Sequence, residues 1–239
     1  MVNLFLTEVL KLKRSSMFLI SILGAAVAPF VVVIATYLNE PSILFKELFY
    51  NVNLYTVLII GVPLYGVVTT YLFNREYMEN TLKNILIIPV SRIGFIVSKM
   101  LLLFIWIMML TLIAWTLTLV LGMLTQFDGL SISLVMESLS QFSIGGMFLF
   151  ILSTPIILVT LVMKNYVPTI IFTVVITLIN VMGGNSEHRA LFPWAAAGDI
   201  ANNTLPLTYP PEYSYIAITA TALAGFIAMI VYFNKTDIH

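Results

Sequence analysis

Charged side chains gather in one short segment of this chain, between Asn74 and Lys99. The segment carries six of the 22 charged residues, and a long apolar run lies on either side of it. Lysine, arginine and glutamate at close spacing can form charge-assisted hydrogen bonds with another protein, which are about twice as strong as neutral ones. We therefore expect the chain to couple to another molecule through this segment.

The first part of the segment, approximately residues 75–88, has the periodicity of an amphipathic helix. Its polar face carries Glu76, Glu79, Asn80 and Lys83, and its apolar face carries Met78, Leu82, Ile85 and Leu86. Pro89 ends the pattern, and Ser91 can cap the helix that follows. A solvated loop is the alternative, but well-placed acids and a regular apolar face favour a short helix parallel to the membrane.

Apolar runs dominate the rest of the chain. Hydrophobic residues make up 60% and charged residues 9% of the 239 residues, against about 45–50% and 25% in an average soluble domain. Six charge-free intervals are each long enough for a helix of the ~20 residues that cross a bilayer, and too continuous for barrel strands. We predict one all-α transmembrane domain, residues 1–239, with spans at approximately 17–38, 54–73, 100–122, 143–163, 166–183 and 214–233.

The distribution of basic residues predicts the orientation of these spans. If both termini are cytoplasmic, nine of the 11 lysines and arginines lie inside, which satisfies the positive-inside rule. Residues 1–14 place Glu8, Lys11 and Arg14 opposite an apolar face, which predicts an amphipathic helix in the cytoplasmic interface. A cleaved signal peptide is the competing reading, but the next apolar run continues to Asn39, long enough to span.

Small residues and prolines mark features within the spans, and one outer loop is long. Ala217, Ala220, Ala224 and Ala228 have the spacing of a close helix contact, either inside one subunit or between two. Pro29, Pro63 and Pro155 lie within helices, where kinks are expected. Loop 184–212 contains the apolar stretch ALFPWAAAG, which predicts a short re-entrant or interfacial helix.

The predicted spans hold no Asp, Glu, Lys, Arg or His, which limits the function of the chain. Ion-coupled carriers usually keep ionisable groups near the membrane centre, and intramembrane hydrolases need a base or paired acids. We therefore expect no enzyme, and neither catalytic nor metal-binding residues. No cysteine is present, which excludes disulfides and thiolate metal sites.

Four short motifs follow one another in the charged segment and its flanks: Glu76, Thr81-Leu82-Lys83, Pro89-Val90-Ser91-Arg92 and Ser98-Lys99. This order resembles the cytoplasmic signature between the second and third spans of type 2 ABC exporter permeases. The resemblance is greatest to the six-helix permeases of bacitracin, lantibiotic and cytolytic-peptide export in Gram-positive bacteria. The opening stretch from Glu8 to Ser15 is similar too, whereas Asn80 stands where many relatives have glycine.

The resemblance implies that residues 75–88 are a coupling helix that docks on a cytoplasmic ABC ATPase. Its implied coupling residues are Glu76, Glu79, Thr81, Lys83 and Arg92. The sequence has no G-x-x-x-x-G-K-[ST] loop, so ATP and Mg²⁺ would bind to the ATPase. Two ATPase copies and a second permease, identical or related, would complete the complex in the bacterial plasma membrane, surrounded by membrane lipid and without nucleic acid.

The uncharged spans and the resemblance together predict amphipathic or antimicrobial peptides as cargo. A small polar solute would lose its hydration without compensation, whereas an amphipathic cargo can keep its apolar face against apolar side chains. The candidate residues of the substrate path are Tyr65, Thr69, Thr111 and Trp115. A non-transport scaffold or assembly protein, and an ABC exporter of lipid or envelope polymer, remain the alternatives.

Because the chain has no cysteine, single cysteines can test the predicted topology without background labelling. In intact cells, Ser91→Cys should be shielded from a membrane-impermeant thiol reagent and Ser186→Cys should be labelled. Opening the cells should expose the first cysteine. The reverse pattern would invert the predicted orientation of every span.

Overall fold

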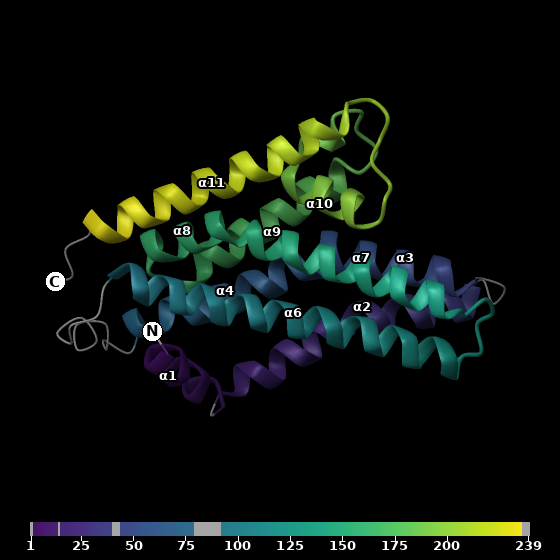
Figure 1. Cartoon of the computed structure of the whole chain (residues 1–239), viewed down its shortest axis with the longest axis horizontal. Coiled ribbons are helices and arrows are strands. Elements are labelled where there is room, and N and C mark those ends of the chain that lie inside the picture. Colours follow the sequence, from purple (N-terminus) through teal and green to yellow (C-terminus); the bar gives the residue numbers. More distant parts are fainter. Residues whose placement is uncertain (1, 14, 40–43, 79–91, 236–239) are drawn as a thin grey trace.

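The computed structural model is an elongated helical bundle, and it describes residues 2–13, 15–39, 44–78 and 92–235 (Figure 1). No β-strand occurs among these described residues, so the predicted all-helical class is confirmed. The elements in chain order are α1 (Val2–Lys13), α2 (Ser16–Asn39), α3 (Phe45–Tyr55), η1 (Thr56–Ile60), α4 (Gly61–Met78), α6 (Arg92–Leu124), α7 (Ile132–Ile151), α8 (Ser153–Met163), α9 (Tyr166–Met182), η2 (Arg189–Leu191), α10 (Pro193–Ala201) and α11 (Pro211–Lys235).

Five helical runs in the described residues are long and apolar enough to cross a membrane. They are Ser16–Leu38, Phe45–Met78, Ile93–Leu124, Ile132–Met163 and Pro211–Lys235. The sixth predicted span corresponds to α9, which has 17 residues and is therefore about 26 Å long. The second and third runs extend well beyond the predicted limits 54–73 and 100–122, so helix continues into the segments where we expected water-exposed chain.

The two ends of the chain lie at the same end of the bundle. Figure 1 shows α1 beside the start of α6, and the C-terminal end of α11 points to this end as well. Here Lys164, in the turn between α8 and α9, lies with its ammonium 5.5 Å from the centre of the Tyr77 ring. The arrangement is that of an even number of crossings; the side of the membrane on which this end lies stays a prediction.

Proline interrupts the α-helical hydrogen bonding in two of the long runs. Pro63 has no N–H for the carbonyl of Ile59 and would clash with it in a regular helix. The backbone widens just before it into η1, a π-helical turn in which Gly61 donates to the carbonyl of Thr56. Pro155 likewise follows the break at Leu152 that separates α7 from α8. Around Pro29, by contrast, α2 is continuous.

The inner face of α11 packs tightly against α8. A Cβ atom at Gly225 would lie 2.6 Å from the backbone nitrogen of Pro155, so only glycine allows this approach. Thr154 bridges the same contact by donating to the carbonyl of Ala222, at 2.8 Å. Ala220 and Ala224, from the predicted small-residue stripe, are instead exposed. At these two positions the stripe does not serve packing within the subunit.

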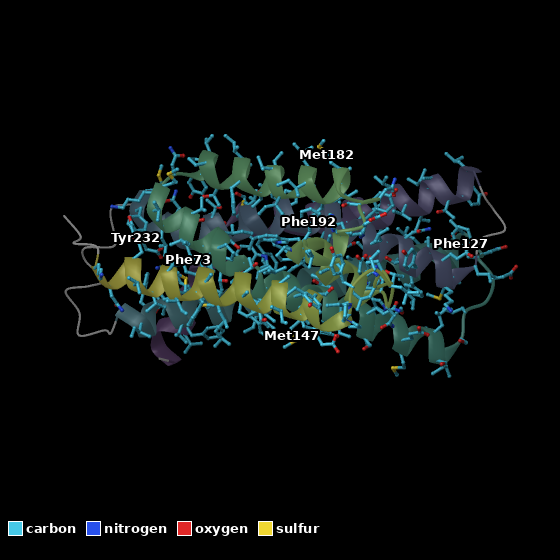
Figure 2. The ribbon with its side chains drawn as sticks, turned by 90° about the horizontal axis from the view of Figure 1, so that it is seen from above. Phe73, Phe127, Met147, Met182, Phe192 and Tyr232 are labelled. Carbon is cyan, nitrogen blue, oxygen red and sulfur yellow. The ribbon has the colours of Figure 1, made fainter. Side chains whose placement is uncertain are left out.

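The long outer loop folds into the bundle through α10, the apolar stretch predicted to be a short helix. Its alanines, Gly198 and Asp199 are buried. Arg189 from η2 donates to both carboxylate oxygens of Asp199, at 2.8 and 2.9 Å, which fixes η2 to α10. Figure 2 shows Phe192, at the start of α10, within the outline of the bundle, whereas Met182 at the end of α9 points outward.

Candidate functional site

Four charged side chains from three helices form a buried cluster near one end of the bundle. The Lys99 ammonium from α6 lies 2.9 Å from the Glu8 carboxylate of α1 and 2.8 Å from the Glu76 carboxylate of α4. Lys11 of α1 completes the cluster, at 2.7 Å from Glu8 and 3.2 Å from Glu76. Only 1% of the Lys99 and Glu76 side chains is exposed, and 27% of Lys11.

The cluster balances two carboxylates against two ammonium groups, which is the condition for burying them. An unpaired charge in an apolar interior loses its hydration without compensation. The Lys99 ammonium makes a third hydrogen bond, to the carbonyl of Leu72 at 2.6 Å, and lies 5.1 Å from the centre of the Phe95 ring. Its donor capacity is thus used entirely within the protein.

The helix α6 is long enough to place this cluster at the edge of the membrane. It has 33 residues and a length of about 50 Å, whereas the hydrocarbon core is about 30 Å thick. Lys99 is in the second turn from its start at Arg92. This length allows the charges to lie outside the central layer of the membrane while they are buried inside the protein.

The orientation of α1 differs from the one expected for a helix whose polar face meets water. Glu8 faces the bundle and is 6% exposed, whereas Leu6 and Leu10 are exposed, at 52% and 65%. Arg75 adds a further contact by donating to the backbone carbonyl of Lys11, at 3.4 Å. The polar face of α1 is turned inward because it pairs with Lys99 and Glu76 of the bundle. The periodicity of α1 alone does not show that such partners exist.

The cluster shifts the pKa values of its two α1 members in opposite directions. Burial acts to raise the pKa of Glu8, but the charge of Lys99 and hydrogen bonds from Lys11 and Lys99 outweigh it, so this pKa is lowered. Burial acts to lower the pKa of Lys11, but its contacts with Glu8 and Glu76 raise it overall. The stabilisation from Glu8 is lost as pH falls through its lowered pKa, and that from Lys11 as pH rises through its raised pKa. Both charges persist at neutral pH.

The structure locates one of the expected coupling residues in this cluster. Glu76 belongs to α4, which runs on to Met78, so a separate helix does not begin at Arg75. Its buried carboxylate is not part of an exposed polar face, because helix α4 turns it toward Lys99 and Lys11. The expected coupling residues Glu79, Thr81 and Lys83 lie outside the described residues, as does the Arg92 side chain.

Sequence reasoning missed the partners of Glu76. Glu8 and Lys11 were assigned to an interfacial helix, and Lys99 was identified only as the end of the charged segment and as part of the Ser98-Lys99 motif. One feature of the sequence could have predicted ion pairing: acids and bases occur in equal numbers near segments that otherwise lack charge. It indicates that pairing is needed, but distances along the chain of 65 and 23 residues do not indicate which charges meet.

The four expected substrate-path residues are core contacts in this structure. The hydroxyl groups of Tyr65 in α4 and Thr111 in α6 lie 2.9 Å apart, and both side chains are buried. Thr69 is also fully buried. Trp115 is elsewhere in the core and donates to the Ser138 hydroxyl of α7, at 3.0 Å. Their role in transport stays a prediction.

An apolar groove of about 400 Å³ lies between α1, α2 and α6, apart from those four residues. It is lined by Phe5, Val9, Leu12, Phe18, Leu102, Ile105, Trp106 and Met109. A groove of this composition can hold hydrocarbon or apolar side chains but offers few hydrogen bonds. Within the described residues, no three His, Asp or Glu side chains gather in a way that could hold a metal ion.

Removing the central ammonium of the cluster should destabilise the protein. Lys99→Met leaves two buried carboxylates with only the partly exposed Lys11 as a partner. Breaking a buried ion pair by removing one partner costs about 3–5 kcal/mol. The melting temperature of the detergent-solubilised protein should fall, whereas exposed Lys46→Met should have little effect. Adding Glu8→Gln and Glu76→Gln to Lys99→Met should recover part of the loss. Equal melting of wild type and Lys99→Met would contradict a stabilising cluster.

Comparison with known proteins agrees with the resemblance found in the motifs. A protein-family model described as "ABC-2 family transporter protein" matches residues 4–180, a range that contains the whole charge cluster. The bacitracin transport permease protein BCRB of Bacillus licheniformis is 60% identical over 205 residues, which cover 86% of this chain and 98% of that protein. These matches, together with the bundle of membrane-spanning length, show that the chain belongs to the ABC-2 family of transporter proteins.

Proposed function

We propose that this chain is the permease of an ATP-driven exporter that removes bacitracin or a similar peptide antibiotic from the bacterial plasma membrane. The observation that carries this proposal is the 60% identity to a bacitracin transport permease, over 98% of that protein's length. The matched residues cover 86% of this chain, so the similarity extends over most of the bundle. A resistance or peptide-secretion role follows from the same activity.

The chain is a transport subunit that works with a separate ABC ATPase, as its family implies. ATP and Mg²⁺ belong to that partner, because the chain lacks the loop that cradles nucleotide phosphates. We place the docking contact in the segment that joins α4 to α6, with Glu79, Thr81 and Lys83 as its polar groups. Glu76 and Arg92 flank this segment, and Glu76 acts through the cluster.

The charge cluster supports this placement because it connects both ends of the segment. Glu76 lies two residues before the end of α4, and Lys99 lies in the second turn of α6. Since Glu8 also binds Lys99, at 2.9 Å, α1 is attached to the same point. A displacement of the docked segment by the ATPase would then move α1, α4 and α6 together, because separating them exposes buried charges.

Amphipathic cargo fits the surfaces that the described residues offer. Lys99 and Glu76 are paired within the charge cluster, so they present no free charge to a small polar solute. The groove between α1, α2 and α6 can accept apolar side chains of a peptide that arrives from the bilayer. A lipid or envelope polymer would also fit an apolar groove, and identity to a bacitracin permease favours the peptide.

A second permease, identical or related, would complete the complex over two ATPases. The outer face of α11 supports such a contact, because Ala220 and Ala224 are exposed there in the described structure. Small residues let two helices approach closely in a membrane, where packing rather than the hydrophobic effect drives association. We propose this face for the contact between permeases.

Reversing one charge in the docking segment should weaken coupling. Glu79→Arg removes a carboxylate that can accept charge-assisted hydrogen bonds. It also introduces a positive charge, which a basic surface on the ATPase would repel. Recovery of the co-purified ATPase, or its cargo-stimulated ATP hydrolysis, should fall severalfold. Exposed Glu137→Arg at the other end of the bundle is the matched control. Unchanged recovery and hydrolysis in Glu79→Arg would reject this docking site, and no ATPase in the complex at all would favour a scaffold.

The cargo can be identified by protection in a susceptible host. Co-expression of the permease with its ATPase should raise the inhibitory concentration of bacitracin severalfold, and an ATPase-dead mutant should remove this protection. A lantibiotic and a helical cytolytic peptide, measured in parallel, define the range of cargo. If none of the three peptides is tolerated better, peptide export is the wrong activity and a lipid or polymer becomes the better hypothesis.

A further inference from the structure

Two asparagine side chains meet in the interior of the outer half of the bundle. The amide nitrogen of Asn53 in α3 donates to the side-chain oxygen of Asn202, which follows α10, at 2.8 Å. Asn53 is fully buried and Asn202 is 5% exposed. Gly145 of α7 closes over the pair, since a Cβ atom there would lie 3.5 Å from the Asn53 side-chain oxygen.

Each asparagine keeps one polar atom without a hydrogen-bond partner among the described residues. These atoms are Oδ1 of Asn53 and Nδ2 of Asn202, and the hydroxyl of Thr56, one turn after Asn53, is in the same condition. Exchanging the amide oxygen and nitrogen in both residues would still leave one donor and one acceptor. A buried polar group without a partner is costly, so the site is suited to a ligand with a matching donor and acceptor.

The backbone near the pair is irregular on the α3 side. Asn53 comes just before η1, where the hydrogen bonds are wider than in an α-helix, and such π-helical turns are frequent at functional sites. Asn202 follows α10, whose contact with η1 is made by small groups, including Gly198 against Leu58. The contact between α10 and η1 is thus close, because Gly198 brings the backbone of α10 against the Leu58 side chain.

Hydrogen bonds connect α10 to the outer part of the bundle rather than to α3. Arg189 fixes η2 to Asp199 of α10. Ser214 of α11 donates to the carbonyl of Ala190 in η2, at 3.0 Å. These bonds join α10, η2 and the start of α11 into one unit. The Asn53–Asn202 hydrogen bond connects this unit to α3, in the second long helical run.

We propose that the Asn53–Asn202 pair is a binding site for a backbone amide of the peptide cargo, exposed when α10 withdraws from η1. One residue of an extended peptide presents its N–H and its C=O on the same side, and these match the free acceptor of Asn53 and the free donor of Asn202. Both partners are uncharged, so the cargo needs no charge to bind here. The site deepens the proposed peptide export and rests on it.

This chemistry distinguishes a peptide from an ester lipid. The carbonyl of an ester can accept from Asn202, but an ester has no N–H to donate to Asn53. A lipid would therefore leave one buried acceptor unpaired, whereas the N–H and C=O of one extended residue satisfy both groups. The amide pair selects for the backbone, and the apolar surroundings select for peptides that can enter a membrane.

Binding to the purified permease–ATPase complex in lipid nanodiscs tests this site, with bacitracin as the probe. Asn53→Leu and Asn202→Leu should each weaken bacitracin binding about threefold to tenfold, the loss of one hydrogen bond. Asn74→Leu is the matched control, since Asn74 is another fully buried amide with unpartnered atoms in the described structure. It lies 21 residues further along the same helical run, about 30 Å away. Melting temperatures of all variants establish that they are folded.

A second probe isolates the N–H contact. A short apolar peptide should bind wild type and Asn74→Leu more tightly than its backbone N-methylated form, which keeps every carbonyl but lacks N–H groups. Asn53→Leu should bind both forms equally. The site would be overturned if folded Asn53→Leu kept the wild-type preference, or if both leucine variants bound bacitracin with unchanged affinity. The pair would then serve to bind water or to pack the helices. Failure of wild type to bind bacitracin or either form of the short peptide would instead overturn the proposed peptide export.

Discussion

The need to pair every charge in a low-dielectric interior organises one end of this protein. Lys99 cannot be buried in α6 unless carboxylates reach it, and Glu8 and Glu76 do so from two other helices. Without Lys99, each of these carboxylates would keep only the partly exposed Lys11 as its partner. The four-charge cluster therefore depends on all three helices, and it holds α1, α4 and α6 in one arrangement.

A similar constraint acts on the backbone. In a membrane, a carbonyl freed by proline must find another donor or face the loss of a hydrogen bond. Before Pro63 the helix widens into η1, where Gly61 donates to the carbonyl of Thr56. Before Pro155 the run divides into α7 and α8, and Thr154 crosses to α11. Both irregularities lie in the bundle interior, where neighbouring helices surround them.

The two ends of the bundle consequently have different chemistry. At one end, full charges on Glu8, Glu76, Lys11 and Lys99 make a tight connection among helices that flank the segment proposed to meet the ATPase. Toward the other end, uncharged amides make a weaker and incompletely paired contact between α10 and α3. An exporter needs a firm connection where force is received and a contact that opens readily where cargo passes, and this distribution of bond strengths fits both.

The sequence by itself determined the all-helical membrane class, because continuous apolar runs of spanning length have no other stable form in a bilayer. It also determined the charged segment between the second and third spans and, through short motifs around Glu76 and Lys99, the family. These features are local: they depend on composition and on residues close together in the chain. The short helix in the outer loop, α10, was predictable for the same reason.

Only the tertiary structure decided which groups meet. Periodicity assigned Glu8 to a face that should contact water, yet Lys99, 91 residues away in the chain, turned it inward. The sequence did not indicate that the hydroxyl groups of Tyr65 and Thr111 are hydrogen-bonded to each other. Asn53 and Asn202, 149 residues apart, drew no attention in the sequence. Burial and pairing depend on contacts between segments that are distant in the chain. The spacing of residues along one helix does not predict which other helices pack against it.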